Sequence, residues 1–494
     1  MARWLGFVGP SYTAKSKIAA YDRSVNLFCE RVESGTSAEA YTLYQANGVS
    51  SAQTGLDSPG RGGIANVSTI TGPSSSAQNF FFVSGSTLYE YPSTVRATGI
   101  VNGSGAPVTM VWNGFQGHQI LIASDSTTYC YDTTSHALTN VGIGMYVDFL
   151  QGYGLRLNSG DSTFSFSALF DMTSWDALDV VQRQDASDRW IRLIVHHKEV
   201  WLFGSNTTSV YYLGDDADTP FQQISSVFIT MGIIAPDSAC IVDGTLMWIG
   251  GNDAGQGVVY RADGYTPVRV STHAVEYALQ AGNAFGNLST AEGCTYQQNG
   301  HVFYEITLPG IAPDEVGGVQ GSTWVYDATE GLWHERGLYT GIGYQEMDTR
   351  GAFDGFTLSR SAGTVYSIVT DARSTSAFKS TDGTGIRWMR RAPHLSKENK
   401  GCIIDSVELK FQPGMASATG AGSDPHFTLT QSRNGGQTWS NARTVSAGLI
   451  GQFEKRALWD GLGYGRDRLI EIVGSDPIFT PIIDAYVDAR FGRS

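Results

Sequence analysis

A short alternating run that ends in an aromatic residue recurs along most of this chain. Clear copies are Val83–Tyr91, Ser126–Asp132 and Phe203–Tyr212, each closed by small or polar turn residues. The aromatic anchors of the repeat are Tyr89, Tyr129, Phe166, Tyr211, Tyr260, Tyr326 and Tyr366. Most intervals between anchors are 37 to 49 residues, the length of one four-stranded propeller blade. The repeat therefore predicts an all-β chain built around an irregular β-propeller of six or seven blades.

The composition agrees with a chain of short strands and tight turns. Glycine accounts for 59 of 494 residues, about 12% against roughly 7% in average proteins, whereas charged residues make up 16% against about 25%. One short helix is predicted at Thr272–Gln280, with Ser271 or Thr272 as its N-cap and Gly282 as its stop. The segment Gly310–Gly321 is predicted to form a long exposed hairpin loop.

The repeating pattern of the sequence changes after about residue 385. Val407, Leu409 and Phe411 alternate with polar neighbours, and Leu469–Val473 reads as a further strand. These runs predict a separate β-sandwich at the C-terminal end. The predicted parts are an N-terminal extended segment that closes or docks on the propeller (1–50), the propeller (51–385) and the C-terminal β-sandwich (386–494).

Charge and cysteine content exclude several classes of protein. The chain has 33 Lys and Arg against 47 Asp and Glu, a net charge of −14. Proteins that bind nucleic acid tightly present basic surfaces, so this charge argues against that class. Its five cysteines lie far apart without CxxC spacing, which indicates free thiols in a reducing compartment. No stretch approaches the roughly 18 apolar residues of a membrane span, so no membrane insertion is expected.

Five basic side chains gather at the junction between the two predicted parts. They are Arg387, Arg390, Arg391, Lys397 and Lys400, in an otherwise acidic chain. One interpretation is a strand that crosses between domains with its charges in solvent. The other is a contact surface for an acidic partner. The sequence leaves both interpretations open and makes these five residues the candidate partner interface.

The strongest short motif is a degenerate Asp-box, Ser-x-Asn-x-Gly-x-Thr-Trp, in which Asn replaces the usual Asp. Its members are Ser432, Asn434, Gly436 and Trp439. We expect a structural turn in which Asn434 caps its own backbone, Gly436 takes a positive φ, and Trp439 packs back on the hairpin. Asp-boxes also occur in sialidases, so the alternative is a carbohydrate-active or receptor-binding β-propeller. A glycosidase needs two carboxylates at a defined separation, and no motif here designates a pair.

Other catalytic templates are missing from the sequence. There is no phosphate-binding GxxxxGK[ST] loop, no GxSxG elbow and no HExxH helix. His196 and His197 are predicted to lie on a strand with their side chains on opposite faces, where they cannot share a metal ion. We therefore predict no catalytic residues, no metal site and no cofactor, and a protein that is not an enzyme.

Short phrases near the start of the chain match a known family. The run Gly6–Tyr12, followed by Tyr21–Glu30 with its Arg-x-x-Asn-Leu-aromatic-x-Glu phrase, resembles the opening of the packaged-DNA stabilisation proteins. These are the tail hub or nozzle proteins of short-tailed bacteriophages. Met172–Asp176 and Val200–Gly204 are further matches in the expected order, although Cys29 stands where the family commonly has Pro.

The resemblance implies a non-enzymatic virion component that is assembled in the host cytoplasm. It implies a ring, a hexamer in relatives, that docks under the head-to-tail adaptor and carries a tail needle, spikes or fibres. Duplex DNA would be retained by this ring and later pass through it without regard to sequence. A basic lumen would hold DNA by releasing counterions, whereas an acidic one lets it slide, so the net charge of −14 fits such a channel wall. The loop Gly310–Gly321 is a candidate gate.

Overall fold

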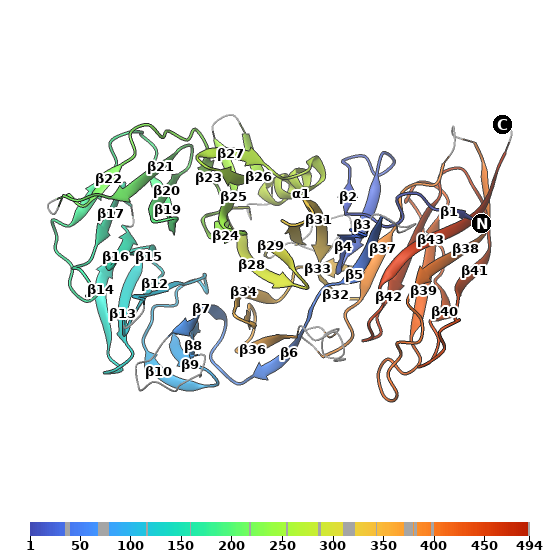
Figure 1. The fold of residues 1–494 in the computed structure, drawn as a ribbon, viewed down its shortest axis with the longest axis horizontal. Coiled ribbons are helices and arrows are strands. Elements are labelled where there is room, and N and C mark those ends of the chain that lie inside the picture. The colour runs from blue at the N-terminus through green and yellow to red at the C-terminus, as the bar shows by residue number, and fades with distance from the viewer. Residues whose placement is uncertain are drawn as a thin grey trace.

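The computed structural model of the chain is elongated, with a ring of small sheets at one end and the C-terminal strands, orange to red, at the other (Figure 1). Strands dominate, and the fold is all-β. The residues that the structure describes are 1–34, 40–67, 79–114, 117–158, 160–216, 219–252, 255–284, 288–309, 322–341, 343–369, 379, 383–396 and 400–492.

The first four sheets of the ring are four-stranded antiparallel blades that follow one another along the chain. Blade 1 contains β7 (Gly60–Val67), β8 (Asn79–Ser84), β9 (Thr87–Glu90) and β10 (Thr94–Thr98). Blade 2 contains β11 (Thr109–Trp112), β12 (Gln119–Ser124), β13 (Thr127–Asp132) and β14 (Leu138–Ile143). Blade 3 contains β15 (Tyr146–Leu150), β16 (Tyr153–Leu157), β17 (Thr163–Phe166) and β18 (Val180–Gln182). Blade 4 contains β19 (Trp190–His196), β20 (Glu199–Gly204), β21 (Thr208–Leu213) and β22 (Phe221–Gln223).

Three further blades complete the ring. Blade 5 contains β23 (Gly232–Ile233), β24 (Cys240–Val242), β25 (Thr245–Asn252), β26 (Gly255–Asp263) and β27 (Thr266–Arg269). Blade 6 contains β28 (Glu292–Gln298), β29 (His301–Leu308), β30 (Ser322–Asp327) and β31 (Leu332–Arg336). Blade 7 contains β34 (Thr349–Phe353), β35 (Phe356–Ser359), β36 (Val365–Val369) and the N-terminal strand β6 (Gly48–Gln53).

The ring closes in two ways. Strand β6, from the start of the chain, pairs with β36 as the fourth strand of blade 7, and β34 of blade 7 contacts β7 of blade 1. The described residues thus form a propeller of seven blades. Six of the seven aromatic anchors found in the sequence lie on the third strand of their blade and are buried, and the half-buried Tyr260 lies on β26, the next-to-last strand of blade 5.

Apolar side chains pack between neighbouring blades. Phe80 and Phe82 of blade 1 meet Leu358 and Val365 of blade 7, and a similar cluster separates each of the next blade pairs through to blades 5 and 6. Because the two middle strands of a blade are covered on both faces, they read as apolar runs rather than as a clean alternation.

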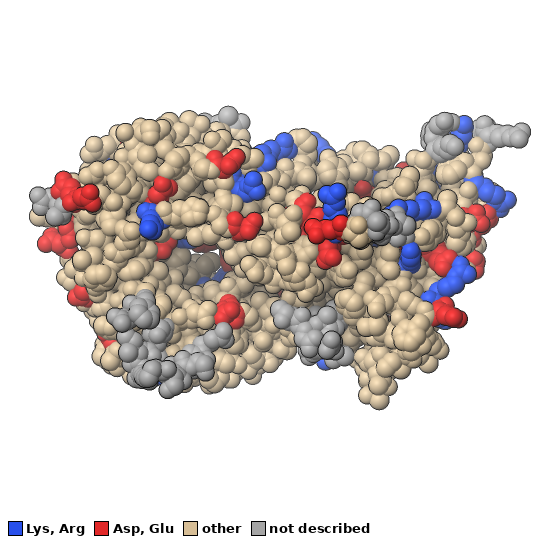
Figure 2. Space-filling model, in the orientation of Figure 1, with Lys and Arg blue, Asp and Glu red and all other residues tan. Residues whose placement is uncertain are grey.

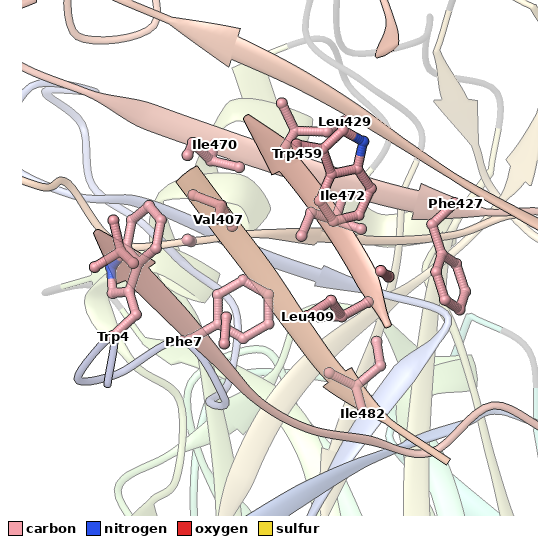
Figure 3. Packing of buried hydrophobic residues seen from close by; sticks show 14 of the residues in the cluster. Trp4, Phe7, Val407, Leu409, Phe427, Leu429, Trp459, Ile470, Ile472 and Ile482 are labelled. Carbon is pink, nitrogen blue, oxygen red and sulfur yellow. The ribbon is translucent and has the colours of Figure 1, made fainter. Parts of the chain in front are cut away.

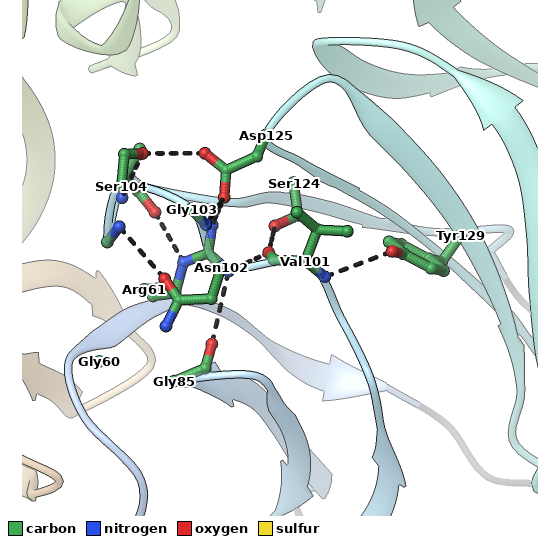
Figure 4. A network of polar contacts seen from close by, with 12 residues as sticks. Gly60, Arg61, Gly85, Val101, Asn102, Gly103, Ser104, Ser124, Asp125 and Tyr129 are labelled. Carbon is green, nitrogen blue, oxygen red and sulfur yellow. Dashed lines mark hydrogen bonds and ion pairs between the residues drawn. The ribbon is translucent and has the colours of Figure 1, made fainter.

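Polar side chains also join the blades. The buried guanidinium of Arg61 donates to the Ala106 carbonyl at 2.9 Å and the Val101 carbonyl at 2.7 Å, and it pairs with Asp125 at 2.9 Å (Figure 4). Arg350 of blade 7 donates to the Gly60 carbonyl of blade 1 at 2.9 Å. These contacts satisfy charged groups that would otherwise be costly to bury.

The C-terminal strands form a β-sandwich of two sheets. One sheet has the order β4 (Leu27–Arg31), β5 (Tyr41–Gln45), β43 (Ile482–Phe491), β38 (Cys402–Phe411) and β41 (Ala457–Gly465), with β1 (Ala2–Arg3) also on β43. The other has β3 (Tyr21–Val25), β37 (Trp388–Arg391), β42 (Leu469–Gly474), β39 (His426–Ser432) and β40 (Arg443–Ser446), with β2 (Tyr12–Thr13) on β3. Leu409, Trp459 and Ile472 fill the space between the sheets (Figure 3).

The first 50 residues are divided between the two parts of the molecule. Strand β6 joins blade 7, whereas β1, β4 and β5 lie in the sandwich sheet with β43, and β3 lies between β31 of blade 6 and β37 of the sandwich. Trp4, Phe7 and Leu27 belong to the sandwich core, and burial of these apolar side chains helps to hold this part of the segment on the sandwich (Trp4 and Phe7 in Figure 3). Strand β3 also pairs in parallel with β31, so one ten-stranded sheet runs from blade 6 into the sandwich.

The one α-helix among the described residues is α1 (His273–Ala284), and two single 3₁₀ turns are η1 (Pro236–Ser238) and η2 (Leu288–Thr290). The Thr272 hydroxyl accepts a hydrogen bond from the Val275 N–H at 3.4 Å, as an N-cap does. The helix continues past Gly282, which the sequence predicted as its stop. Val275 and Leu279 are buried against blades 5 and 6, and this packing outweighs the roughly 1 kcal/mol that an interior glycine costs a helix.

A small hairpin, β32 (Leu338–Tyr339) and β33 (Tyr344–Gln345), forms a separate two-stranded sheet after blade 6. The predicted loop Gly310–Gly321 lies outside the described residues. In the described part of the chain, no helix has both the length and the apolar character needed to span a bilayer.

Candidate partner interface at the junction of propeller and sandwich

The Arg-x-x-Asn-Leu-aromatic-x-Glu phrase forms the joint between the two parts. Asn26 has a φ of +56°, and its side-chain amide donates to the Gly337 carbonyl at 2.8 Å and to the Arg387 carbonyl at 2.9 Å. Its Oδ1 accepts from the Gly337 N–H at 3.1 Å. One side chain thus ties the end of the blade 6 segment to the start of the sandwich strand β37.

The other members of the phrase cross the same joint. Arg23 pairs with Glu335 of β31 at 2.6 Å, and both side chains are buried. Phe28 packs edge-on against Phe303 of blade 6, with ring centroids 5.3 Å apart. Glu30 lies 3.3 Å from Nε2 of His301. The resemblance found in the sequence is therefore carried by residues that hold the sandwich on blade 6.

Two histidines beside this joint have opposite electrostatic surroundings. The pKa of His301 is raised, first by its hydrogen bond to Asp327 at 2.7 Å and then by Glu30, against the effect of burial. Burial lowers the pKa of His334 to about 3, so that ring stays neutral. Both rings pack against Phe303.

Arg390 and Arg391 are buried, so for these two residues the structure corrects both interpretations, charges in solvent and a contact surface for a partner. Arg390 donates to the carbonyls of Gly6 at 3.0 Å and Gly9 at 3.1 Å, and burial lowers its pKa to about 10. Arg390 therefore anchors the N-terminal segment. The guanidinium has five N–H donors, and the carbonyl oxygens of the adjacent N-terminal segment supply the acceptors.

Arg391 joins the two sequence motifs singled out above. Its guanidinium pairs with Glu471 at 2.7 Å. It lies 3.9 Å from the ring centroid of Tyr21 and 4.8 Å from that of Trp439, the last residue of the Asp-box. The charge is thus neutralised inside the sandwich, between two aromatic rings, and is not available to a partner.

The remaining basic residues differ in their placement. Arg387 is half-buried, with its guanidinium 3.6 Å from the ring centroid of Tyr339. Lys400 is half-buried, and Lys397 lies outside the described residues. Of the four predicted interface residues that the structure describes, Arg387 alone lines a cavity of about 670 Å³, which is bounded by Gly337–Thr340 on one side and Thr384–Arg387 on the other. Sequence reasoning found Arg387 but missed Tyr339, because nothing in the sequence shows that the two segments meet.

The Asp-box folds into a compact turn in the sandwich. The Ser432 hydroxyl accepts from the Gly436 N–H at 2.9 Å, and Asn434 Oδ1 accepts from the Thr438 N–H at 3.0 Å. Gly436 has a φ of +89°. Trp439 faces Arg391 of β37. Each of the four Asp-box residues therefore makes a contact within the sandwich, through its side chain or its backbone.

The structure also places the residues considered for metal binding. His197 lies beyond the end of β19 with a φ of +49°, and its ring stacks on that of His196 at 3.8 Å, so the two rings do not point to opposite faces as predicted. The strand ends at His196, and the turn brings the second ring back. Among the described residues, no group of three or more His, Cys, Asp or Glu could hold a metal ion. All five cysteines are free.

Comparison with solved structures finds matches at low similarity. The chain is 12% identical to dihydro-heme d1 dehydrogenase NirN over 55% of each chain, with a TM-score of 0.35. It is 14% identical to YCF48 bound to D1 peptide over 66% of this chain and 96% of that one (TM-score 0.36), and 8% identical to a chain of the mitotic checkpoint complex over 69% and 96% (TM-score 0.39). The chain thus spans about half the length of NirN. No curated protein matches the sequence significantly.

Comparison with protein families gives two matches that cover both parts of the molecule. Residues 16–331 match the family described as Bacteriophage P22 Gp10, beta-propeller, and residues 387–489 match that described as Bacteriophage P22 Gp10, beta-sandwich. The first match alone covers more than half of the chain, and the two descriptions agree with the propeller and the sandwich seen in the structure. The chain therefore belongs to the family of bacteriophage P22 Gp10, the tail hub and stabilisation proteins of podoviruses, and is a structural component of a phage tail.

Proposed function

We propose that copies of this chain assemble into a hexameric ring that retains packaged DNA and forms part of the ejection channel. The ring would connect the head-to-tail adaptor to a needle, spikes or fibres, and would be assembled in the host cytoplasm. The family match over both parts of the molecule carries this proposal. The described fold supports it, because a rigid propeller joined to a sandwich by a continuous sheet can form a mechanically stable wall of a channel.

The distribution of charge supports passage of DNA rather than capture. Residues 51–385 contain 14 Lys and Arg against 32 Asp and Glu, a net charge of −18, whereas the rest of the chain has 19 against 15, a net of +4. In Figure 2, acidic residues are spread over the propeller end, and basic ones gather toward the junction and the sandwich. A surface without a basic tract releases few counterions from duplex DNA and so binds it weakly.

The oligomeric state tests the ring. We expect native mass spectrometry and negative-stain images of the purified chain, or of purified tails, to show six copies around an open centre. A chain that stays monomeric at micromolar concentration, and that is missing from purified particles, would contradict the proposed function.

Binding to duplex DNA tests the channel wall separately. In a gel-shift experiment at low salt, the assembled ring should leave linear duplex DNA largely unshifted at micromolar protein. Tight binding under these conditions would contradict a channel wall along which DNA slides, even if the ring itself is present.

We also propose that the chain acts without catalysis. The Asp-box residues that suggested a sialidase are held in a turn, and Trp439 lies over a buried arginine. No described observation favours the carbohydrate-active alternative. Hydrolysis of a sialoside by the purified chain would reopen it.

A further inference from the structure

The cavity at the junction is a groove between two extended segments. Gly337–Thr340 forms one wall, Thr384–Arg387 forms the other, and Gln345 and Ser475 complete the lining. Asn26 bonds to the carbonyls of Gly337 and Arg387 and so fixes the spacing of the walls at one end. The volume of about 670 Å³ lies within the range of built ligand sites, and interfaces between domains are common places for them.

One wall of the groove is a short edge strand. Gly337 uses its N–H and carbonyl on Asn26, and Thr340 donates to the Gly343 carbonyl, so the edge that faces the groove is that of β32. Strands β32 and β33 pair only with each other in the described part of the chain, and all four residues from Gly337 to Thr340 line the cavity. A two-stranded sheet is only marginally stable alone, and an unpaired edge is a template for another strand. Addition of an extended peptide to such an edge is a recurrent mode of recognition.

The other wall supplies one uncompensated charge. Arg390 and Arg391 are neutralised or saturated inside the sandwich, but no described carboxylate pairs with Arg387. Its guanidinium lies 3.6 Å from the ring centroid of Tyr339, which is 42% exposed. Stacking holds a guanidinium in place and leaves N–H groups at its edge able to bind a carboxylate with two hydrogen bonds.

We propose that this groove binds an extended, acidic peptide segment of another tail protein, which adds a strand to β32 and places a carboxylate on Arg387. The inference rests on the proposed function only in placing the chain within a tail. Binding of DNA at this groove is disfavoured, because Arg387 is the one cation in the described part of the lining and phosphate backbones are held by several.

Photo-crosslinking in purified particles tests the inference on the full chain. We would replace Gln345, in the lining, by p-benzoylphenylalanine, irradiate the particles, and map the crosslinked peptide by mass spectrometry. The same substitution at Tyr464, 56% exposed on the sandwich strand β41, is the matched control position. We expect a crosslink from Gln345→p-benzoylphenylalanine to a segment of another tail protein that contains Asp or Glu, and none to that segment from the control.

A second substitution tests the role of the charge. Arg387→Ala should lower the crosslink yield at least tenfold and Arg387→Lys much less, whereas Arg490→Ala, which removes an exposed and ion-paired arginine elsewhere, should leave it unchanged. Arg387→Ala should lower the thermal unfolding midpoint of the purified chain only slightly, since this side chain pairs with no described carboxylate and loses only its stacking on Tyr339 and Tyr344. Arg387→Ala could fold but fail to be incorporated into particles, while Arg387→Lys is incorporated. That result would also show that binding of the partner segment requires the positive charge.

Several results would overturn the inference. They are a crosslink to DNA, a crosslink to a second copy of this chain, no crosslink, or a yield that is insensitive to Arg387→Ala. Failure of the proposed function is distinguishable, because the chain would then be missing from the particles before irradiation.

Discussion

At the scale of single residues, arginines that look alike in the sequence have different roles. Arg390 saturates backbone carbonyls of the N-terminal segment, Arg391 is neutralised between two aromatic rings, and Arg387 faces a groove. These three lie within five positions of one another on or beside one strand. Residue type and local charge density therefore did not distinguish a partner surface from a buried anchor, because the packing of distant segments decides which side chains meet solvent.

Replacement of Arg391 by Ala should be strongly destabilising. The change leaves the Glu471 carboxylate, 13% exposed, without its partner, and breaking a buried ion pair costs about 3–5 kcal/mol. Urea unfolding should show this loss, whereas Arg490→Ala, at an exposed pair on the same sandwich, should show no measurable change. Equal effects of the two variants would contradict the buried role of Arg391.

The contribution of His301 to stability should depend on pH. Its pKa is raised above 6.5 in the folded chain, mainly by the hydrogen bond to Asp327, so the protonated ring stabilises the fold. This stabilisation is fully present below about pH 6.5 and is lost as the pH rises through the higher folded pKa. The difference in unfolding free energy between the wild type and His301→Gln should therefore be largest near pH 6 and shrink toward pH 8.5.

The comparison with His301→Gln separates this effect from that of His334. His334 is held neutral in the fold chiefly by burial, so its own contribution makes the chain less stable as the pH falls below 6.5 in both proteins. A difference between wild type and His301→Gln that is constant with pH would show that His301 acts only through packing.

At the scale of elements, turns were more predictable than the ends of helices. The Asp-box sequence specifies its own hydrogen bonds, because Ser, Asn and Gly act on backbone groups two to four residues away. Gly282 did not stop α1, since burial of Val275 and Leu279 against two blades comes from residues far along the chain. His197 turned back because it and Lys198, both with positive φ, form the two-residue turn between β19 and β20.

Gly436→Ala should destabilise the sandwich more than Gly451→Ala. Both glycines have positive φ, at +89° and +79°, which costs an L-residue about 1–2 kcal/mol. A Cβ at Gly436 would also lie 3.0 Å from the Tyr21 ring and 3.2 Å from Leu469, whereas nothing lies within 4 Å of one at Gly451. Chemical unfolding of the two variants should differ by about the cost of mild overpacking, 1–3 kcal/mol. Equal losses would mean that Tyr21 and Leu469 move aside freely.

At the scale of the whole molecule, the propeller and the sandwich share strands from the first 50 residues. The chain starts in the sandwich, closes blade 7 with β6, runs round the ring, and returns to the sandwich. Asn26, Arg23 and Phe28 lie at the crossing. The two parts should therefore unfold together.

Asn26→Ala should uncouple them. The change removes three hydrogen bonds across the joint, each worth about 1 kcal/mol. We expect one thermal transition for the wild type and two, or a new protease-sensitive site near the junction, for Asn26→Ala. Asn102→Ala, which removes a local turn bond to the Gly105 N–H, is the matched control and should keep one transition. A single transition in both variants would show that the shared sheet suffices to couple the parts.

The sequence alone determined the fold class, the repeating blade, the sandwich that follows it and the family. These depend on local alternation, on turn residues and on aromatic anchors, and such signals act within a few tens of residues. Only the tertiary structure decided that there are seven blades, that β1 to β5 belong to the sandwich, and which arginine faces a groove. Each of these depends on a pairing between segments hundreds of residues apart, such as β6 with β36 or Asn26 with Arg387, and the free energy of such contacts comes from surfaces that no local pattern describes.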